Sequence, residues 1–326
     1  MNRRNAAGFT WILITGQYPP QQGGVADYTF SLATALARAG DAVHVFAPPC
    51  IGRPRASDGV SVYRLPDEYG PRARAMLSSA LAHIPAPRAA VVQYVPQSFG
   101  LRGCNIFFAR WLRTLKNFPL FVMFHEVSVT VGRDTPLKYR IQAMATRTMA
   151  RYAIGAADAI FTSTPSWVPL IDTLRSPHAA IDWMAVPSNI PVENDAVATS
   201  ALRSYLADEN RLLLGHFGTY REKYTRDTLT KLVPLLLDGK RSMLFLGRGS
   251  REFVDGLCGS FPKLAERLRG TGDLQPEDLA NHIAACDLLI QPFEEGVTAR
   301  RSSVAAALAL GVPLITTTGV LTEPFW

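Results

Sequence analysis

Two adjacent arginines near the end of the chain carry the side chains best suited to binding an anion. Arg300 and Arg301 follow an acidic turn at 294–296 and precede an Ala-rich run. We expect Thr298 to cap a helix, which would place both arginines in its first turn, where a cation typically costs ~0.3–1 kcal/mol. An anion bound by backbone N–H groups and guanidinium forks would explain that placement. The alternative is a pair of solvated arginines on a surface helix; the neighbouring carboxylates, which can bind hydroxyls of the same ligand, favour the anion site.

A second set of cations follows another predicted strand. Arg221 and Lys223 lie in the segment GTYREK, directly after an apolar run at 212–217. We expect this loop at the same sheet edge as the arginine pair. Four cations converging there would suit a diphosphate, whose charge is costly to bury unpaired. The alternative is a solvated basic loop.

Two positions in the first half of the chain also lie where ligands bind in open parallel sheets, at the carboxyl ends of strands. A predicted buried strand at 120–124 ends on His125. This histidine either faces a ligand or is a structural residue with its hydrogen bonds made inside the fold. Its position at the carboxyl end of a strand favours the ligand. Gly23 and Gly24 end a turn-rich loop and would let a phosphate or sugar approach the backbone, or form an ordinary turn. The loop lacks the GxGxxG fingerprint, which argues against a nicotinamide or flavin site.

Alternating strands and helices would position all of these residues. A segment at 187–196, rich in proline and asparagine, is predicted as an interdomain linker. The alternation predicts two Rossmann-like, doubly wound α/β domains that face each other across a cleft, at residues 1–190 and 191–326. The predicted strands are 11–15, 42–47, 60–65, 89–94, 120–124, 159–163, 184–186, 212–217, 242–246, 270–272, 287–291 and one that starts at Pro313. Helices are expected from Asp27, at 105–116, after 164–166, from Arg226, from Glu252, from Pro276 and from Thr298.

Composition narrows the class of protein. The chain has 326 residues, 48% of them hydrophobic and 19% charged, which is enough for two sizeable cores, and its net charge of +7 suggests an anionic partner. Lys and Arg are scattered, so a nucleic-acid-binding tail is not expected. Four isolated cysteines predict a reducing compartment and neither a disulfide framework nor a metal site. The apolar stretches fall short of the ~20 residues of a membrane span. We therefore expect a cytoplasmic protein, with peripheral contact at the inner face of the membrane allowed.

The order and spacing of several motifs resemble the GT-B glycosyltransferases, and the chain is most similar to family 4 of the glycosyltransferases. The resemblance implies metal-independent transfer of a sugar from a nucleotide diphosphate sugar to a saccharide or lipid-linked acceptor in polysaccharide or glycolipid biosynthesis, with retention of anomeric configuration and no cofactor. The motifs are YPPQQGGVADYTFSLATALARAGDAVHVFAP, FVMFHE, ADAIFTSTPSW, AVPSNI, FGTYREK, LFLGRGS, GDLQPEDLANHIAACDLLIQPFEEG and ALALGVPLITT.

The resemblance also implies roles for single residues. In the second domain, Arg221 or Lys223 would bind the donor diphosphate, and Glu295 would contact donor sugar hydroxyls. In the first domain, Gly24 would lie near the phosphate and His125 near the reacting sugar. The donor site would be completed by Gly296 and by the predicted helix start, Thr298, Arg300 and Arg301.

Three departures from the family pattern leave the identity of the sugar donor open. The glutamate that the family places on the ribose corresponds here to Ala306, and the basic loop begins Gly218-Thr219 rather than Gly-Arg. The sequence also stops soon after a Thr-Gly loop, which predicts a second domain truncated at the C-terminus. Alternatives to a transferase are therefore a GT-B-fold sugar epimerase and a non-catalytic nucleotide-sugar-binding pseudoenzyme.

Overall fold

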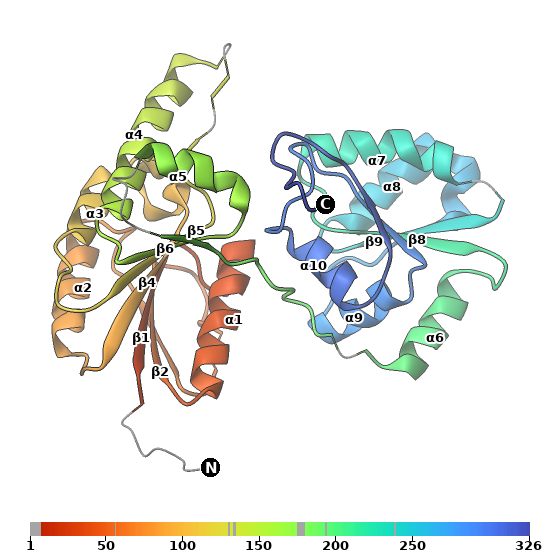
Figure 1. Ribbon diagram of the computed structural model, residues 1–326. Coiled ribbons are helices and arrows are strands. Elements are labelled where there is room, and N and C mark those ends of the chain that lie inside the picture. Colours follow the sequence, from red (N-terminus) through yellow and green to blue (C-terminus); the bar gives the residue numbers. More distant parts are fainter. Residues whose placement is uncertain are drawn as a thin grey trace. The chain divides into compact units, whose positions relative to one another are not determined.

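The computed structural model describes residues 8–326 except 56, 130, 133–134, 175–179, 193 and 238. The chain divides into two compact units, residues 1–185 and 186–326, and each is built on its own parallel sheet (Figure 1). Within the described ranges, no helix combines the length and the apolar character that crossing a membrane requires.

Unit 1 holds a seven-stranded parallel sheet in the order β3-β2-β1-β4-β5-β6-β7. Its inner strands are nearly continuous apolar runs, as expected for strands covered on both faces. The strand order reverses between β1 and β4, so the loops after these strands border the point where open α/β sheets bind ligands. The strands are β1 (Thr10–Thr15), β2 (Ala42–Ala47), β3 (Val60–Arg64), β4 (Arg88–Tyr94), β5 (Leu120–Phe124), β6 (Ala159–Thr162) and β7 (Ile181–Trp183).

Helices cover both faces of this sheet. Helix α1 (Gly24–Arg38) packs on one face, where Ala33 meets Leu13 and Val45. The other face carries a larger core, covered by four helices on the far side from α1 (Figure 1). These are α2 (Pro71–His83), α3 (Ile106–Leu112), α4 (Leu137–Ile154) and α5 (Val168–Leu174), with short 3-10 turns η1 (Pro96–Phe99), η2 (Leu101–Gly103) and η3 (Pro165–Trp167) between them.

Unit 2 holds a five-stranded parallel sheet in the order β10-β9-β8-β11-β12, with a separate hydrophobic core on each face. Its order reverses between β8 and β11, which is therefore the ligand-binding edge that topology predicts. The strands are β8 (Leu212–Phe217), β9 (Arg241–Leu246), β10 (Leu268–Gly270), β11 (Leu288–Gln291) and β12 (Leu314–Thr316). The helices are α6 (Ala196–Leu206), α7 (Lys223–Leu236), α8 (Ser250–Ser260), α9 (Pro276–Ala284) and α10 (Ser302–Ala309), with the 3-10 turn η4 (Pro262–Arg267).

These two sheets confirm the prediction of two Rossmann-like α/β units. Several predicted boundaries were wrong, among them the following three. The last strand of unit 1 lies at 181–183 instead of 184–186. Helix α1 starts at Gly24 with Gly23 as its N-cap, so Asp27 lies inside the first turn and does not cap it. Helix α3 covers only 106–112 of the predicted 105–116. The Asn105 side chain caps its start by accepting from the Phe108 N–H at 3.0 Å, and Arg113 is its C-cap.

Candidate functional site

His125 lies at the carboxyl end of β5, where its orientation is fixed by the neighbouring strand. Its backbone N–H donates to the Tyr94 carbonyl at 3.0 Å, and its Nε2 lies 2.7 Å from Oε1 of Gln93. The ring meets the Tyr28 ring edge-on at 4.8 Å between centroids. Only 7% of His125 is exposed, so the residue is almost wholly enclosed at the sheet edge.

Gln93 is a partner of this histidine that the sequence analysis missed. It is fully buried in β4, after the apolar run at 89–92. A buried amide needs a hydrogen-bond partner to offset its desolvation, and Oε1 finds one in His125. The signal in the sequence was a polar residue within the run RAAVVQY.

Gly24 begins helix α1 beside open space, because a β-carbon added to it would meet no described atom within 4 Å. The glycine that the backbone requires is its neighbour. Gly23 has φ 154°, and a β-carbon there would lie 2.7 Å from Oε1 of Gln17. The close approach proposed for Gly24 is thus sterically possible, whereas Gly23 sets the conformation of the turn.

The cations of unit 2 lie at one sheet edge. Because β8 and β11 are hydrogen-bonded in parallel, the segments that follow them leave the sheet on the same side. Arg221 is exposed in the connection after β8. Lys223 is the first residue of α7, although it was predicted to lie in the loop; its ammonium pairs with Asp227 one turn along, and its side chain is 88% exposed.

The connection after β9 packs closely against the one after β8. Gly247 has φ 103°, and a β-carbon there would lie 2.4 Å from the carbonyl oxygen of Gly218. Helix α8 then begins at Ser250 after Gly249, which has φ 80°. The backbones of these two loops are therefore held together at the carboxyl ends of β8 and β9.

The arginine pair precedes its helix, so the predicted helix start was wrong. Helix α10 begins at Ser302 with Arg301 as its N-cap, and no side chain caps it. Thr298 lies in a separate turn, in which its carbonyl accepts from the Arg301 N–H at 3.1 Å. In this turn the Ala299 N–H donates to the carboxylate of Glu323, in the C-terminal segment. The cost expected for cations in a first helical turn accordingly does not arise.

Both arginines are sheltered from solvent. An Arg300 N–H donates to Oε2 of Glu295 at 3.0 Å, and the exposed fractions of these two side chains are 18% and 43%. The Arg301 guanidinium lies over the Phe293 ring at 4.5 Å from its centroid. The turn therefore presents a half-exposed carboxylate whose direction is set by a sheltered guanidinium.

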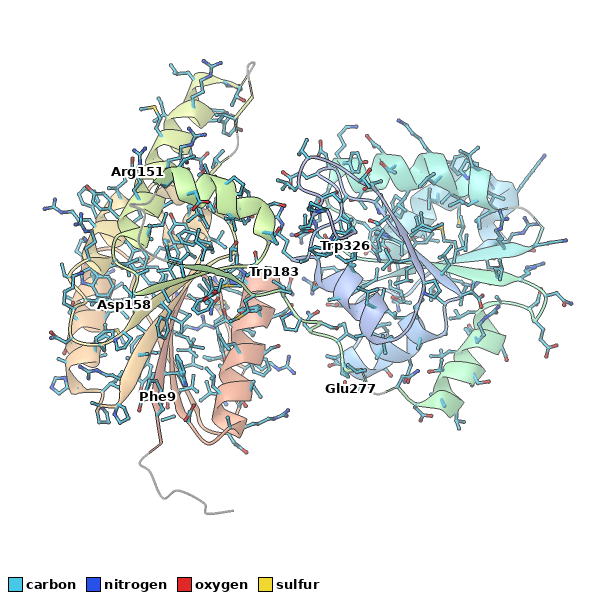
Figure 2. The ribbon with its side chains drawn as sticks, viewed as in Figure 1. Phe9, Arg151, Asp158, Trp183, Glu277 and Trp326 are labelled. Atoms are coloured by element: carbon cyan, nitrogen blue, oxygen red, sulfur yellow. The ribbon has the colours of Figure 1, made fainter. Side chains whose placement is uncertain are left out.

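Glu323 holds this turn in place and was not foreseen from the sequence. It is 1% exposed, and its two carboxylate oxygens accept from the Ala299 N–H at 3.0 and 3.2 Å. Oε2 also accepts from the indole N–H of Trp326 at 2.7 Å, in the C-terminal segment labelled in Figure 2. Buried carboxylates need such charge-assisted bonds to offset their desolvation. The carboxyl end of the chain thus builds part of the site.

Gly296 packs against the same segment. It has φ 88°, and a β-carbon there would lie 2.3 Å from the backbone nitrogen of Gly319. The Leu321 N–H donates to the Glu295 carbonyl at 2.9 Å, and the Val297 N–H donates to the Thr317 carbonyl at 2.9 Å. Only glycine fits this position, because both the backbone angle and the space exclude a side chain.

His216, at the carboxyl end of β8, is a buried titratable group beside these loops. Its Nδ1 lies 2.7 Å from the Ile290 carbonyl, and its Nε2 is buried with no hydrogen-bond partner among the described residues. Burial lowers the pKa of His216 from 6.5 to about 4, against a smaller opposing effect of the Ile290 bond. The imidazole is therefore neutral at pH 7.

This depressed pKa predicts an acid-sensitive unit 2. Because the unfolded chain takes up the proton near pH 6.5 and the folded chain only near pH 4, stability is complete above pH 6.5 and falls as the pH drops between these values. The loss from this group reaches about 3 kcal/mol. Thermal unfolding measured from pH 7 to pH 4 should show a shallower decline for His216→Gln than for the unsubstituted chain; parallel declines would contradict the assignment.

Across the described residues, no group of three His, Cys, Asp or Glu side chains is arranged to hold a metal ion. The candidate site of unit 2 presents cations, backbone N–H groups and one oriented carboxylate. Such a set binds anions and hydroxyl groups.

A family model for the glycosyl transferase 4-like domain matches residues 23–185, which is half of the chain. The chain belongs to the glycosyl transferase 4-like family. The matched region contains Gly24 and His125, and it coincides with nearly all of unit 1. The predicted family and the prediction of a glycosyltransferase are confirmed. A search of curated protein sequences found no match.

Solved structures resemble this glycosyltransferase over nearly its whole length. Sucrose-phosphate synthase from Thermosynechococcus elongatus has a TM-score of 0.73 at 16% identity, with 97% of this chain and 83% of that chain covered. HepE of Anabaena, solved with UDP and glucose, has a TM-score of 0.62 at 14% identity, with coverage of 95% and 81%. A trehalose-6-phosphate protein from E. coli, bound with UDP-2-fluoro glucose, has a TM-score of 0.63 at 11% identity, with coverage of 97% and 88%. At such identities the likeness concerns the fold, and it confirms the predicted GT-B fold.

Proposed function

We propose that this glycosyltransferase moves a sugar from a nucleotide diphosphate sugar to a saccharide or lipid-linked acceptor, in polysaccharide or glycolipid assembly, with retention of configuration and without a metal. One observation carries the proposal. A carboxylate oriented by a sheltered arginine, Glu295 with Arg300, lies at the same sheet edge as the cation-bearing connection after β8. A sugar diphosphate requires this combination of hydroxyl acceptor and anion binder.

The diphosphate would bind at the amino end of α7. Arg221 and Lys223 are both exposed there, and a helix N-terminus adds free backbone N–H groups and positive potential. The pair between Lys223 and Asp227 is exposed, and exposed ion pairs contribute little to stability because water screens them. Lys223 can therefore exchange its carboxylate for a phosphate at little cost. As the bond to the sugar breaks, negative charge grows on the diphosphate, and these cations stabilise it.

The sugar would be held by Glu295. Its carboxylate is half exposed and can accept hydrogen bonds from hydroxyl groups. Arg300 fixes the direction of this carboxylate and therefore acts on the sugar through Glu295, as a positioning residue. In unit 1, His125 has the complementary role: Gln93 fixes its ring at the sheet edge, where we assign it to the reacting sugar, with Gly24 close to the phosphate.

The ligands of two similar structures support a uridine nucleotide as the first donor class to test. HepE was solved with UDP-glucose and the E. coli protein with UDP-2-fluoro glucose. A thermal-shift panel of nucleotide sugars should identify the donor, because ligand at 100 times its Kd stabilises a protein by about 2.7 kcal/mol. Product analysis with and without an acceptor then tests for transfer. A panel in which no donor shifts the unfolding temperature, together with no turnover, would contradict the proposal.

Replacing Arg300 and Arg301 together by alanine should weaken donor binding at least ~10-fold, because the oriented carboxylate and its sheltered cations are lost together. Calorimetric titration with the donor identified by the panel measures this. The matched control is Arg211→Ala, since Arg211 pairs with Asp208 before β8, at the opposite edge of the sheet. Equal affinity of the double variant and the control would remove the arginine pair from the site.

A further inference from the structure

Helix α4 has a second apolar face that the fold of unit 1 does not use. Its inner face packs on the sheet through residues such as Met149 and Ala153. On the opposite face, Leu137, Ile141 and Met144 are 72%, 57% and 70% exposed. Their spacing of four and three residues places them in one stripe along the helix. Three large apolar side chains in one row are more than the scattered exposure that is normal on a protein surface.

The stripe lies on the part of α4 that projects beyond the other helices of unit 1 (Figure 1). A further exposed apolar side chain lies on an element that touches α4. Leu101 of η2 is 60% exposed, and η2 touches α4 where the side-chain amide of Gln142 donates to the Arg102 carbonyl at 2.8 Å. Gln142 lies well round the helix from the stripe, so this contact joins η2 to another face of α4.

Basic residues flank this stripe along α4, and the segments of η2, α3 and α4 lack acidic residues. Segments 101–119 and 137–154 contain eight Lys and Arg residues and no Asp or Glu, while the whole chain has a net charge of +7. The excess positive charge of the protein is thus concentrated on η2, α3 and α4. These residues are all exposed: Arg102, Arg110, Arg113, Lys116, Lys138, Arg140, Arg147 and Arg151, the last of which is labelled in Figure 2.

We propose that this basic apolar face, defined by Leu137, Ile141, Met144 and the basic residues of α4, docks unit 1 onto an anionic lipid bilayer. Apolar side chains in a row, flanked by Lys and Arg, are the pattern of a helix that lies in the membrane interface. The apolar row would enter the acyl boundary, and the cations would pair with lipid phosphates. A nucleic acid would match the charge and leave the apolar row unburied. Lipid headgroups form a continuous layer, so a projecting helix can bind them without a surface of complementary shape.

Vesicle binding by the full chain tests this. Vesicles of phosphatidylglycerol and phosphatidylcholine should sediment with the protein at low salt, less so at high salt, and phosphatidylcholine vesicles should bind it far more weakly. Arg140→Ala with Arg147→Ala should lower the affinity for anionic vesicles about thirtyfold, because each Lys or Arg near such a surface contributes roughly fivefold. Ile141→Ser with Met144→Ser should lower it at least ~10-fold through the lost burial of apolar area.

Matched controls in unit 2 separate this face from general charge and hydrophobicity. Lys231→Ala with Lys240→Ala, and Val197→Ser with Leu235→Ser, change exposed residues of the same kinds and should leave vesicle binding unchanged. Unfolding temperatures of all variants confirm that they fold. Failure of the unsubstituted chain to bind anionic vesicles at low salt would overturn the proposal and leave the face to an acidic protein partner; equal losses in the controls would also overturn it. This test does not depend on donor binding, so its failure would not bear on the proposed function.

Discussion

Replacing Arg221 and Lys223 together by alanine should lower kcat/KM for the sugar donor by at least ~100-fold. Each cation is expected to make a charge-assisted hydrogen bond to the diphosphate, and such bonds contribute about 1.5–3 kcal/mol each. Because the charge on the leaving diphosphate grows in the transition state, much of the loss should appear in kcat, with a smaller change in KM. Steady-state kinetics with the donor identified by thermal shift measures both constants.

The chain offers a matched control for this double variant. Lys231 lies farther along α7, and Lys240 lies directly before β9 at the opposite edge of the sheet; both are exposed. Their replacement by alanine removes the same formal charge. It should change kcat/KM by no more than about threefold, as expected for exposed charges away from the site. Equal losses in the two double variants would mean that overall charge, and not the connection after β8, attracts the donor.

Gly296→Ala should destabilise unit 2 by about 3 kcal/mol or more. The new side chain would be forced into a positive φ that costs roughly 1–3 kcal/mol, and its β-carbon would collide with the backbone of Gly319. For a unit of this size, the unfolding temperature should fall by about 10 °C. Calorimetry of the isolated variant measures it, and donor binding should weaken as well because the collision displaces Glu295.

Gly256→Ala provides the comparison. Gly256 lies inside α8, and a β-carbon there would meet no described atom within 4 Å. Alanine is preferred over glycine in a helix interior by about 0.5–1 kcal/mol, so this variant should be slightly more stable than the unsubstituted chain. If the two glycine variants unfolded at the same temperature, the packing of the acidic turn against the C-terminal segment would be refuted.

Most strands could be predicted from the sequence because parallel strands buried on both faces are short apolar runs between turn residues. The ranges 42–47, 120–124 and 212–217 match the structure at both ends. Helices were harder. Helix α6 begins at Ala196, inside the segment 187–196 that was predicted as a linker, where Asp195 caps it by accepting from the N–H groups of Val197 and Ala198. Helix α4 has apolar residues on its outer face as well as its inner face, which blurs the helical period.

The candidate site depends partly on contacts between residues that are far apart in the sequence. That the cation-bearing segments share one edge followed from the order of strands and helices, and the parallel pairing of β8 with β11 confirms it. The start of α10 did not follow, because the turn before it is closed by Glu323, 24 residues farther along the chain. Gln93 and His125 likewise come from different strands. Contacts between distant segments leave no periodic signal in the sequence, so these partners were found only in the folded chain.

The most direct test of the central claim is a crystal structure of this glycosyltransferase with a nucleotide diphosphate sugar bound. We predict that the diphosphate lies at the carboxyl ends of β8 and β11, with Arg221 or Lys223 within hydrogen-bond distance of its oxygens and Glu295 facing the sugar hydroxyls. A diphosphate bound elsewhere, with Glu295 still paired to Arg300 and no ligand atom beside it, would contradict the account.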